Sequence, residues 1–292
     1  MDIEYDTYVA ASVNPKYPPP TELVLALKSL VTTSTPAEDV ARQSVSGFIE
    51  GTQSHPYPGA FHGLLFALIR KYTEQNDRFV DFIVALETLP DPTGEINQLA
   101  GFNEYMTEFA FDYVDRPFSD PEPNVSRQGW VNVNAFTAKL HNRGLPTSGR
   151  QLVRGGQILR RALERAQWEV YHHPDIDEDL EDFEDDEEEE YCQRRDRFME
   201  EMDIRTLNAN APAAAQWIKY CGKEIYNMEG SLGREVTIIT TKWTGKPPGW
   251  SKERWAFWKE RFEWIAGVTA LDRKTRRIAK ETAEEMSRIE QE

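Results

Sequence analysis

The sequence predicts an all-α protein: a multi-helix globular bundle with a disordered acidic insertion and at most one short strand or hairpin. Apolar residues recur at intervals of three and four along most of the chain, which is the period of an amphipathic helix. Only residues 236–241, with the sequence VTIITT, are β-branched throughout and flanked by turn residues, as a strand is. One short strand cannot form a sheet, so helices must build the core.

Proline and glycine residues separate the helices expected in the first half of the chain. The segment HPYPG at 55–59 interrupts the helical period, and Pro90 and Pro92 end another helix because proline lacks the backbone N–H that a helix needs. The apolar stripes between these breaks predict helices within 23–31, 40–49, 61–72, 79–86 and 99–113.

The second half continues the helical pattern on both sides of an acidic run. A helix containing Trp130 to Leu140 is expected to end at Gly144, which can adopt the left-handed conformation of a helix C-terminus. Ser148 stands where a helix N-cap is expected, before a stripe that begins at Leu152. The remaining stripes predict helices within 152–166, 214–228, 250–268 and 271–289.

The predicted domain organisation is simple. Residues 1–20 are polar and end in Tyr-Pro-Pro-Pro, which favours an extended tail. Residues 21–292 are expected to form a single helical domain, with a possible sub-boundary in the proline-rich segment 115–129. An acidic insertion occupies about 174–206, because a block of like charges repels itself and resists packing.

The composition bounds the compartment and the class of partner. The net charge is −16, but thirteen acidic residues lie between Asp175 and Glu190, so the rest of the chain carries only −3. This acidic balance argues against general nucleic-acid binding, and no apolar run is long enough to span a membrane. Two cysteines form no disulfide framework, and the first residues do not resemble a secretion signal, so we expect a cytoplasmic or nuclear protein.

Five of the eight tryptophans lie between Trp243 and Trp264. On a helical wheel of the 250–268 segment, Arg254 and Arg261 fall in the middle of the apolar face, so both should be buried. One hypothesis is a ligand site for an anion, lined by Arg254, Arg261, Trp250 and Trp258. The alternative, which we favour, is a structural core in which a carboxylate from another helix neutralises the arginines.

A second set of arginines recurs at intervals of four and seven, and could bind an anionic partner. The alternative is a solvated face that Glu164 and Glu169 partly neutralise and that the acidic run screens. The adjacent Gly155 and Gly156 predict a close helix contact or a kink. The four arginines are Arg150, Arg154, Arg161 and Arg165.

The sequence offers no recognisable chemistry for an enzyme. His172 and His173 precede acidic residues, but adjacent histidines point in different directions and match no metal-ligand spacing. No serine or cysteine forms a nucleophile motif with a histidine. We therefore expect no catalytic residues, no metal and no cofactor, and the enzyme class is disfavoured.

Several motifs follow Gly129 in a fixed order. A W-x-N-x-N-A-F-x-A-x-L pattern spans 130–140, R-x-A-L-E spans 160–164, and A-A-x-W-I spans 214–218 before Gly222. A turn with Trp243, Gly245 and Lys246 leads into R-W-x-F-W-K-x-R-F at 254–262. The last helix carries Thr275, Ala279 and Met286.

In these motifs the chain resembles a large filamentous-fungal family of unknown function, domain of unknown function 3632. The chain departs from the family pattern at Thr240-Thr241-Lys242, where the family usually has Gly-x-Leu. The resemblance implies a fungal origin and a helical fold, and it brings no assigned catalytic residues.

Together these features predict a non-catalytic protein-interaction or regulatory module that binds a protein partner through the acidic loop and the surface next to it. The alternative is a small-molecule-binding protein, or an enzyme of secondary metabolism, with an interhelical pocket lined by Arg254, Arg261 and tryptophans. A solvent-accessible pocket at those arginines would favour the alternative, and internal carboxylates on them would favour a structural role.

Overall fold

The chain folds as an all-α protein. A computed structural model describes residues 2–57, 59–91, 93–108, 123–145, 151–164, 206–232, 242–245 and 249–292. Within these ranges it contains twelve helices, and the β-structure there is a single isolated bridge between Gly230 and Trp250. The predicted fold class is therefore confirmed for the described residues. The expected strand at 236–241 and the acidic insertion, apart from Thr206, lie outside them.

The helices group into two compact units, which were expected as one domain. The first unit covers Met1–Arg116 and Asn124–Arg150, and the second covers Pro117–Pro123 and Gln151–Glu292. Helical periodicity identifies the residues that are buried but not the helices against which they pack, so the sequence alone did not separate two cores.

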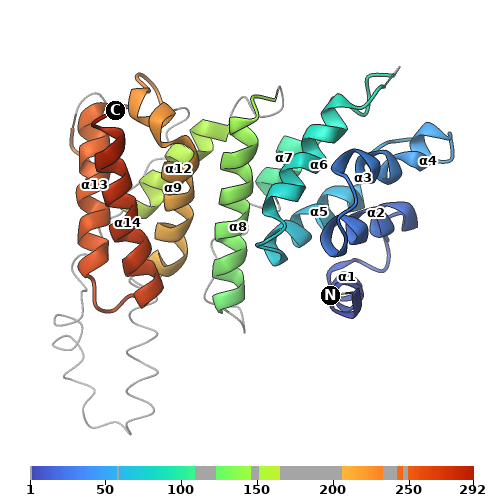
Figure 1. The fold of residues 1–292 in the computed structure, drawn as a ribbon, viewed down its shortest axis with the longest axis horizontal. Helices are drawn as coiled ribbons and strands as arrows, with labels where there is room; N and C mark the ends of the chain where they lie inside the picture. Colours follow the sequence, from blue (N-terminus) through green and yellow to red (C-terminus); the bar gives the residue numbers. More distant parts are fainter. Residues whose placement is uncertain are drawn as a thin grey trace, which may run out of the picture. The chain divides into compact units, whose positions relative to one another are not determined.

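The first unit contains eight described helices (Figure 1). Helix α2 packs on α3, α3 on α6, and α5 on α7. Aromatic and aliphatic side chains from all parts of the unit share one core, including Phe61, Phe79, Phe102 and Phe136. The helices are α1 (Asp2–Ser12), α2 (Thr21–Thr32), α3 (Ala37–Ser44), α4 (Ser46–Ile49), α5 (Gly59–Lys71), α6 (Asn76–Thr88), α7 (Phe102–Met106) and α8 (Pro123–Asn142).

The expectation of an extended tail over 1–20 is wrong for its first part, because Asp2–Ser12 form α1. Tyr5 and Val9, four residues apart, are buried on one face of this helix. The Tyr5 hydroxyl donates a hydrogen bond to the Val24 carbonyl at 2.9 Å, and the Tyr8 hydroxyl donates to the Ala67 carbonyl at 3.0 Å. Tyrosine combines an apolar ring with a polar tip, so a segment of polar composition can still pack.

Helix α8 begins earlier than the sequence predicted. It starts at Pro123, inside the expected 115–129 loop, and ends at Asn142. Gly144 follows with a φ of 64°, which confirms the left-handed residue expected after the helix. Two side-chain hydrogen bonds join α8 to its neighbours: Asn76 Nδ2 donates to the Asn132 carbonyl at 2.9 Å, and Asn132 Nδ2 donates to the Arg70 carbonyl at 2.7 Å.

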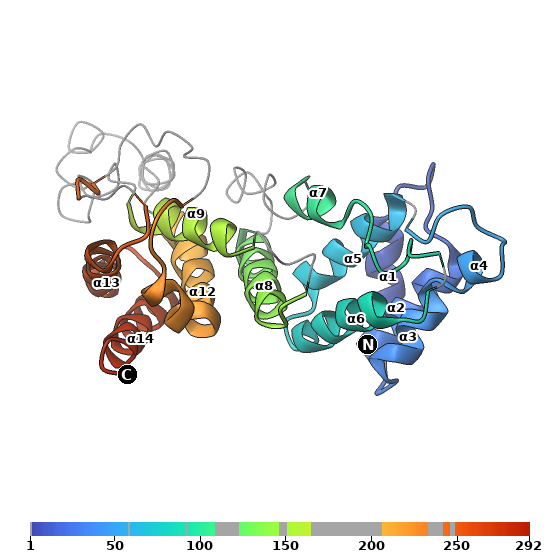
Figure 2. The ribbon, with the colours of Figure 1, turned by 90° about the horizontal axis from the view of Figure 1, so that it is seen from above.

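The second unit is built from α9 (Gln151–Leu163), α12 (Leu207–Asn227), α13 (Lys252–Gly267) and α14 (Arg273–Ile289). The Asp272 backbone N–H donates to Asn208 at the starts of α14 and α12, and Lys223 pairs with Glu292 at their ends, so these two helices run parallel. Helix α13 is antiparallel to α14, because Trp255 near its start bonds Glu290. In Figure 2 these three helices are seen nearly end-on, and α9 runs across them.

Helix α9 approaches its neighbours closely through two adjacent glycines, which confirms the predicted helix contact. A Cβ atom on Gly155 would lie 2.5 Å from Cε3 of Trp217 on α12. A Cβ atom on Gly156 would lie 2.6 Å from Leu232 and 2.7 Å from the Trp250 ring. Only hydrogen atoms fit in this space, so the two indoles can pack directly on the α9 backbone.

Candidate functional site

A fully buried carboxylate, Glu164, organises the interior of the second unit where α9 ends against α13. Glu164 Oε1 accepts hydrogen bonds from Arg254 Nε at 2.7 Å and from the Trp258 indole N–H at 2.8 Å. Glu164 Oε2 accepts from Arg254 Nη2 at 2.8 Å and from Arg160 Nε at 3.4 Å. Arg254 therefore holds the carboxylate in the two-point geometry that a guanidinium favours.

The remaining faces of the Arg254 guanidinium are also occupied by the protein. Its Nη1 donates to the Gly249 carbonyl at 3.0 Å. Its central carbon lies 5.5 Å from the Trp243 ring centroid and 5.8 Å from that of Trp258. Ser251 caps the helix by accepting the backbone N–H of Arg254 at 3.1 Å, which fixes the first turn of α13.

Arg261 lies two turns further along α13 and is also buried, as the helical wheel predicted for both arginines. Its Nε donates to the Leu163 carbonyl at 3.1 Å, and its guanidinium carbon lies 4.9 Å from the Trp264 ring centroid. Burial lowers the pKa of Arg261 to about 10, because desolvation disfavours the charged form. The group remains charged at neutral pH.

The four residues of the predicted ligand site belong to one region. Trp250 packs edge-on against Trp258, with ring centroids 6.0 Å apart and an angle of 89°. Arg254 and Trp258 share the Glu164 carboxylate, and Arg261 bonds the carbonyl of the residue before it. This arrangement favours the structural interpretation, because a carboxylate of the same chain already neutralises the guanidinium that an anionic ligand would need.

Sequence reasoning placed Glu164 on a solvated face, and this was wrong because Glu164 is fully buried. The R-x-A-L-E motif contained the missing signal. Its two charged ends, Arg160 and Glu164, are four residues apart and so share one side of the helix. Both are buried, and the motif thus marks an internal ion pair.

The structure describes half of the predicted line of arginines. Arg154 and Arg161 are half-buried on α9, and Arg150 and Arg165 lie outside the described residues. Arg160, which is outside that line, is the arginine of α9 that reaches the Glu164 carboxylate. The described residues therefore do not place the four predicted arginines together.

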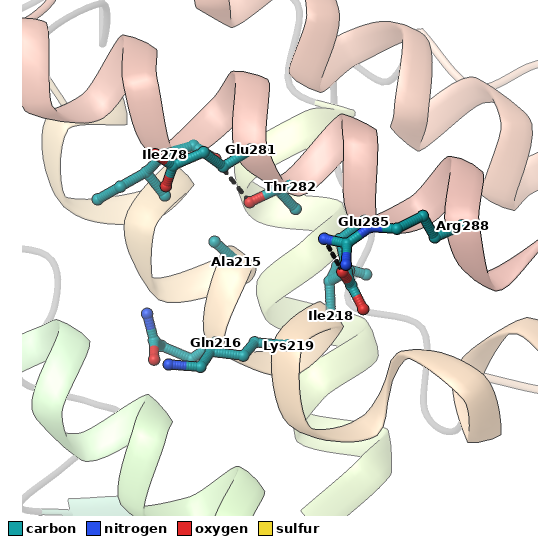
Figure 3. A pocket seen from close by; sticks show the side chains of 9 residues that line it. All are labelled: Ala215, Gln216, Ile218, Lys219, Ile278, Glu281, Thr282, Glu285 and Arg288. Atoms are coloured by element: carbon teal, nitrogen blue, oxygen red, sulfur yellow. Dashed lines mark hydrogen bonds and ion pairs between the residues drawn. The ribbon is translucent and has the colours of Figure 1, made fainter.

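The surface of the second unit is hollowed between α12 and α14. This groove, which we call the α12–α14 groove, has a volume of about 350 Å³ (Figure 3). Ala215, Ile218 and Ile278 provide its apolar surface. Its other lining residues are polar or charged: Gln216, Lys219, Glu281, Thr282, Glu285 and Arg288.

Most polar groups of the α12–α14 groove are bonded within α14. The Thr282 hydroxyl donates to the Ile278 carbonyl at 2.7 Å, and Glu285 pairs with Arg288 (Figure 3). Glu281 pairs with Arg277 at 3.7 Å. On the α12 side, the Lys219 ammonium lies 5.0 Å from the Tyr220 ring centroid. The groove thus offers apolar surface between charged walls.

Comparison with known protein families identifies the chain. A family model described as Protein of unknown function (DUF3632) matches residues 63–262. The chain belongs to this family. No curated protein and no solved structure matches it.

In this DUF3632 protein, the matched segment contains the whole Glu164, Arg254 and Trp258 arrangement together with α9 and α12. Helix α14 lies beyond the match, so the family assignment covers only the α12 wall of the α12–α14 groove. The motif residues Thr275, Ala279 and Met286 also lie beyond it, and all three are buried on α14.

The first unit of the DUF3632 protein contains a buried histidine in an aromatic environment. His62 is fully buried on α5, and both of its ring nitrogens lack a hydrogen-bond partner among the described residues. Its ring stacks on Tyr105 with centroids 4.6 Å apart, and Phe61 packs edge-on against it at 5.2 Å. Burial lowers the pKa of His62 to about 4, so the imidazole is neutral at pH 7.

A larger groove of about 780 Å³ lies in the first unit, between the end of α1, the Tyr17–Pro19 segment and α5. Tyr105 lines it together with Gly63 and Leu64. Arg254, Arg261 and Trp258 line neither this groove nor the α12–α14 groove.

Three further observations concern chemistry among the described residues. No group of three or more histidine, cysteine, aspartate or glutamate side chains there could hold a metal ion. Cys221 is buried, and desolvation raises the pKa of its thiol to about 12, so the thiol stays protonated. No helix in the described ranges is long and apolar enough to cross a bilayer.

Proposed function

We propose that this DUF3632 protein is a non-catalytic protein-interaction or regulatory module of fungal cells, working in the cytoplasm or nucleus. The α12–α14 groove carries the proposal, because it combines exposed apolar surface with charged walls on the described surface of the second unit. Helix-binding grooves have this composition: apolar anchors enter the groove, and charges along its walls set the orientation of the partner.

The size of the groove supports a protein partner. A volume of about 350 Å³ accommodates a few side chains, and the groove is open to solvent along two parallel helices. The exposed charged pairs of its walls are individually weak and can exchange partners at little cost. Such a surface suits reversible contact with another polypeptide.

The alternative, a small-molecule or enzyme site at Arg254 and Arg261, has less support. A ligand anion would have to displace Glu164, which has hydrogen bonds from three side chains. Displacement would leave a carboxylate unpaired in the interior, which costs several kcal/mol, on the order of the penalty for breaking a buried ion pair.

The sequence analysis placed partner binding on the acidic loop and its neighbouring surface. Apart from Thr206, that loop lies outside the described residues, and the α12–α14 groove supports the same class of function through a different surface. Both surfaces can belong to one partner, with the groove providing the apolar anchor.

Photo-crosslinking inside cells that produce the protein tests the proposal. A crosslinking residue at Gln216, in the groove, should yield a discrete adduct with another protein, whereas one at Gln43, exposed on α3 of the first unit, should not. Ile278→Glu, which puts a charge on the apolar surface, should abolish the adduct. Ile49→Glu is the matched control, because Ile49 is 56% exposed on α4 of the first unit. Absence of an adduct from Gln216, or an adduct unaffected by Ile278→Glu, contradicts the proposal.

A further inference from the structure

We infer that the α12–α14 groove takes an amphipathic helix with acidic flanks, whose apolar side chains contact Ile218 and Ile278 and whose carboxylates face Lys219 and the first half of α14. This inference rests on the proposed function, and it adds the chemistry of the partner. It is carried by three observations: the charge distribution along α14, the state of Lys219, and the pairing of the acidic side chains in the groove.

Helix α14 is strongly polarised in charge. Its first eight residues, RKTRRIAK, contain five basic residues and no acidic one, and the acidic residues follow from Glu281 onward. Basic residues at a helix N-terminus oppose the helix dipole, so this arrangement does not stabilise α14 itself. An acidic partner segment would offset the repulsion, because it places negative charge beside both the cations and the positive end of the dipole.

Part of this positive charge lies on the side of α14 that faces the groove. At 100° per residue, Lys274 and Arg277 fall within the same third of the helix as Ile278, Glu281 and Glu285, which line the groove. Lys280, by contrast, points about 100° away from Glu281. Lys274 is exposed and extends the groove wall toward the start of α14.

Lys219 provides the positive charge of the opposite wall. Its side chain lines the groove beside Gln216, and both extend from α12 in Figure 3. The ammonium contacts the Tyr220 ring at 5.0 Å, and within the described part of the chain it forms no ion pair. A cation next to apolar surface is the expected recognition element for a carboxylate that flanks an apolar side chain.

The two acidic residues of the groove do not oppose this inference, because each already has a cation on α14. Glu281 pairs with Arg277 and Glu285 pairs with Arg288. With Lys219 and Lys274 added, the groove and its rim carry net positive charge. The pairs are exposed, so the two arginines can also turn toward an incoming carboxylate.

The apolar part of the groove determines the spacing of the partner's anchors. Ala215 and Ile218 are three residues apart on α12, and Ile278 lies across the groove on α14. The small Ala215 side chain leaves the space that a leucine of the partner would occupy. A helix that presents leucines at positions i and i+4 meets both walls with one face.

The test uses the full-length protein and two fluorescent 16-residue helical peptides. Both peptides carry leucines at i, i+4 and i+7, one is flanked by glutamates, and the other has lysines in their place. Fluorescence anisotropy should show that the acidic peptide binds about tenfold more tightly at low salt, and that the difference shrinks as salt screens the charges. Equal affinities for the two peptides would overturn the inference.

Charge reversal identifies the residue responsible. Lys219→Glu should weaken binding of the acidic peptide about tenfold and strengthen binding of the basic peptide. Lys280→Glu makes the same charge change on α14 outside the groove lining and should change the affinity about twofold or less. If the two variants behave alike, general attraction to the basic helix explains the binding, and the groove assignment fails.

The apolar anchor is tested separately. Ile278→Glu should abolish binding of the acidic peptide, and Ile278→Ala, which removes apolar surface without adding charge, should weaken it about tenfold. Unchanged binding in a folded Ile278→Ala protein would overturn the site. If neither peptide binds wild-type protein while the Gln216 crosslink persists in cells, the acidic-helix inference fails and the proposed function stands. Loss of the crosslink as well removes both.

Discussion

Glu164 in the second unit and His62 in the first are both fully buried polar side chains, yet they differ completely in their partners. Glu164 accepts hydrogen bonds from Arg160, Arg254 and Trp258. His62 is surrounded by aromatic rings, and neither of its ring nitrogens has a hydrogen-bond partner among the described residues. One unit has charge inside its core with matched donors, and the other has a neutral imidazole in an apolar environment.

The difference teaches how each core tolerates a polar atom. A buried charge is retained only when opposite charges and hydrogen bonds replace the lost water, so Glu164 depends on α9 and α13 being held together. A buried imidazole avoids most of this cost by losing its proton, and the depressed pKa of His62 is the sign of that solution. The Glu164 core should therefore fail when a partner is removed, and the His62 core should fail when protons are added.

The largest expected effect is that of Glu164→Gln. The substitution leaves Arg254 and Arg160 buried without their negative partner, which should lower the free energy of unfolding by about 3–5 kcal/mol. Urea unfolding followed by tryptophan fluorescence measures this, because seven of the eight tryptophans belong to the second unit. Glu281→Gln removes an exposed carboxylate from α14 and should cost less than about 0.5 kcal/mol. Equal losses in both variants would contradict the assignment of Glu164 to the core.

The next effect is the loss of stability in acid that depends on His62. The pKa of His62 is about 4 when folded, against 6.5 for an ordinary histidine, so the unfolded chain binds a proton first as the pH falls. The contribution of neutral His62 is complete above pH 6.5 and is lost progressively as the pH falls toward 4, by roughly 3 kcal/mol.

The measurement compares wild type with His62→Leu between pH 7.5 and 4, using circular dichroism during urea unfolding. Because all other titrating groups are shared, the difference in unfolding free energy between the two proteins should grow as the pH falls. His62→Leu should also be no less stable than wild type by more than about 1.5 kcal/mol at pH 7, since it replaces an unsatisfied polar ring with an apolar side chain of similar volume. A difference that does not change with pH would exclude the buried neutral imidazole.

A smaller effect compares two indoles of α13. Trp258 donates to fully buried Glu164 at 2.8 Å, and Trp255 donates to partly exposed Glu290 at 3.0 Å. Trp258→Phe should destabilise the protein by about 1.5–3 kcal/mol more than the ring truncation alone, because the hydrogen bond to a buried charge is lost. Trp255→Phe provides the control for ring truncation, and water can replace its donor. The stabilities of the two variants, measured by thermal unfolding, should rank in that order.

The smallest effect belongs to the groove surface. Lys219→Ala removes an exposed cation whose described contact is with the Tyr220 ring, and it should change the free energy of unfolding by less than about 0.5 kcal/mol. The same variant should still weaken binding of the acidic peptide. A large loss of stability would assign Lys219 to the fold, as Glu164 is, and would remove the contrast between a committed interior and an available surface.

Much of this protein was predictable from its sequence. The period of the apolar residues located the helices, and the helical wheel placed Arg254 and Arg261 in the interior of the second unit, where both are found. Gly155 and Gly156 indicated a close helix contact, and the structure brings Trp217 and Trp250 against them. These properties depend on neighbours within one or two helical turns, which the order of residues specifies directly.

Only the tertiary structure decided which residues meet. Glu164 and Arg254 are ninety residues apart, and helical periodicity gave no reason to pair them or to bury the carboxylate. The helix α1, the division into two units and the α12–α14 groove likewise arise from contacts between distant segments. The sequence by itself determined an all-α fold with buried arginines. The identity of their partner, and the position of the free surface, depended on how the helices pack, because the energy of a buried charge is set by the atoms that surround it and not by its neighbours along the chain.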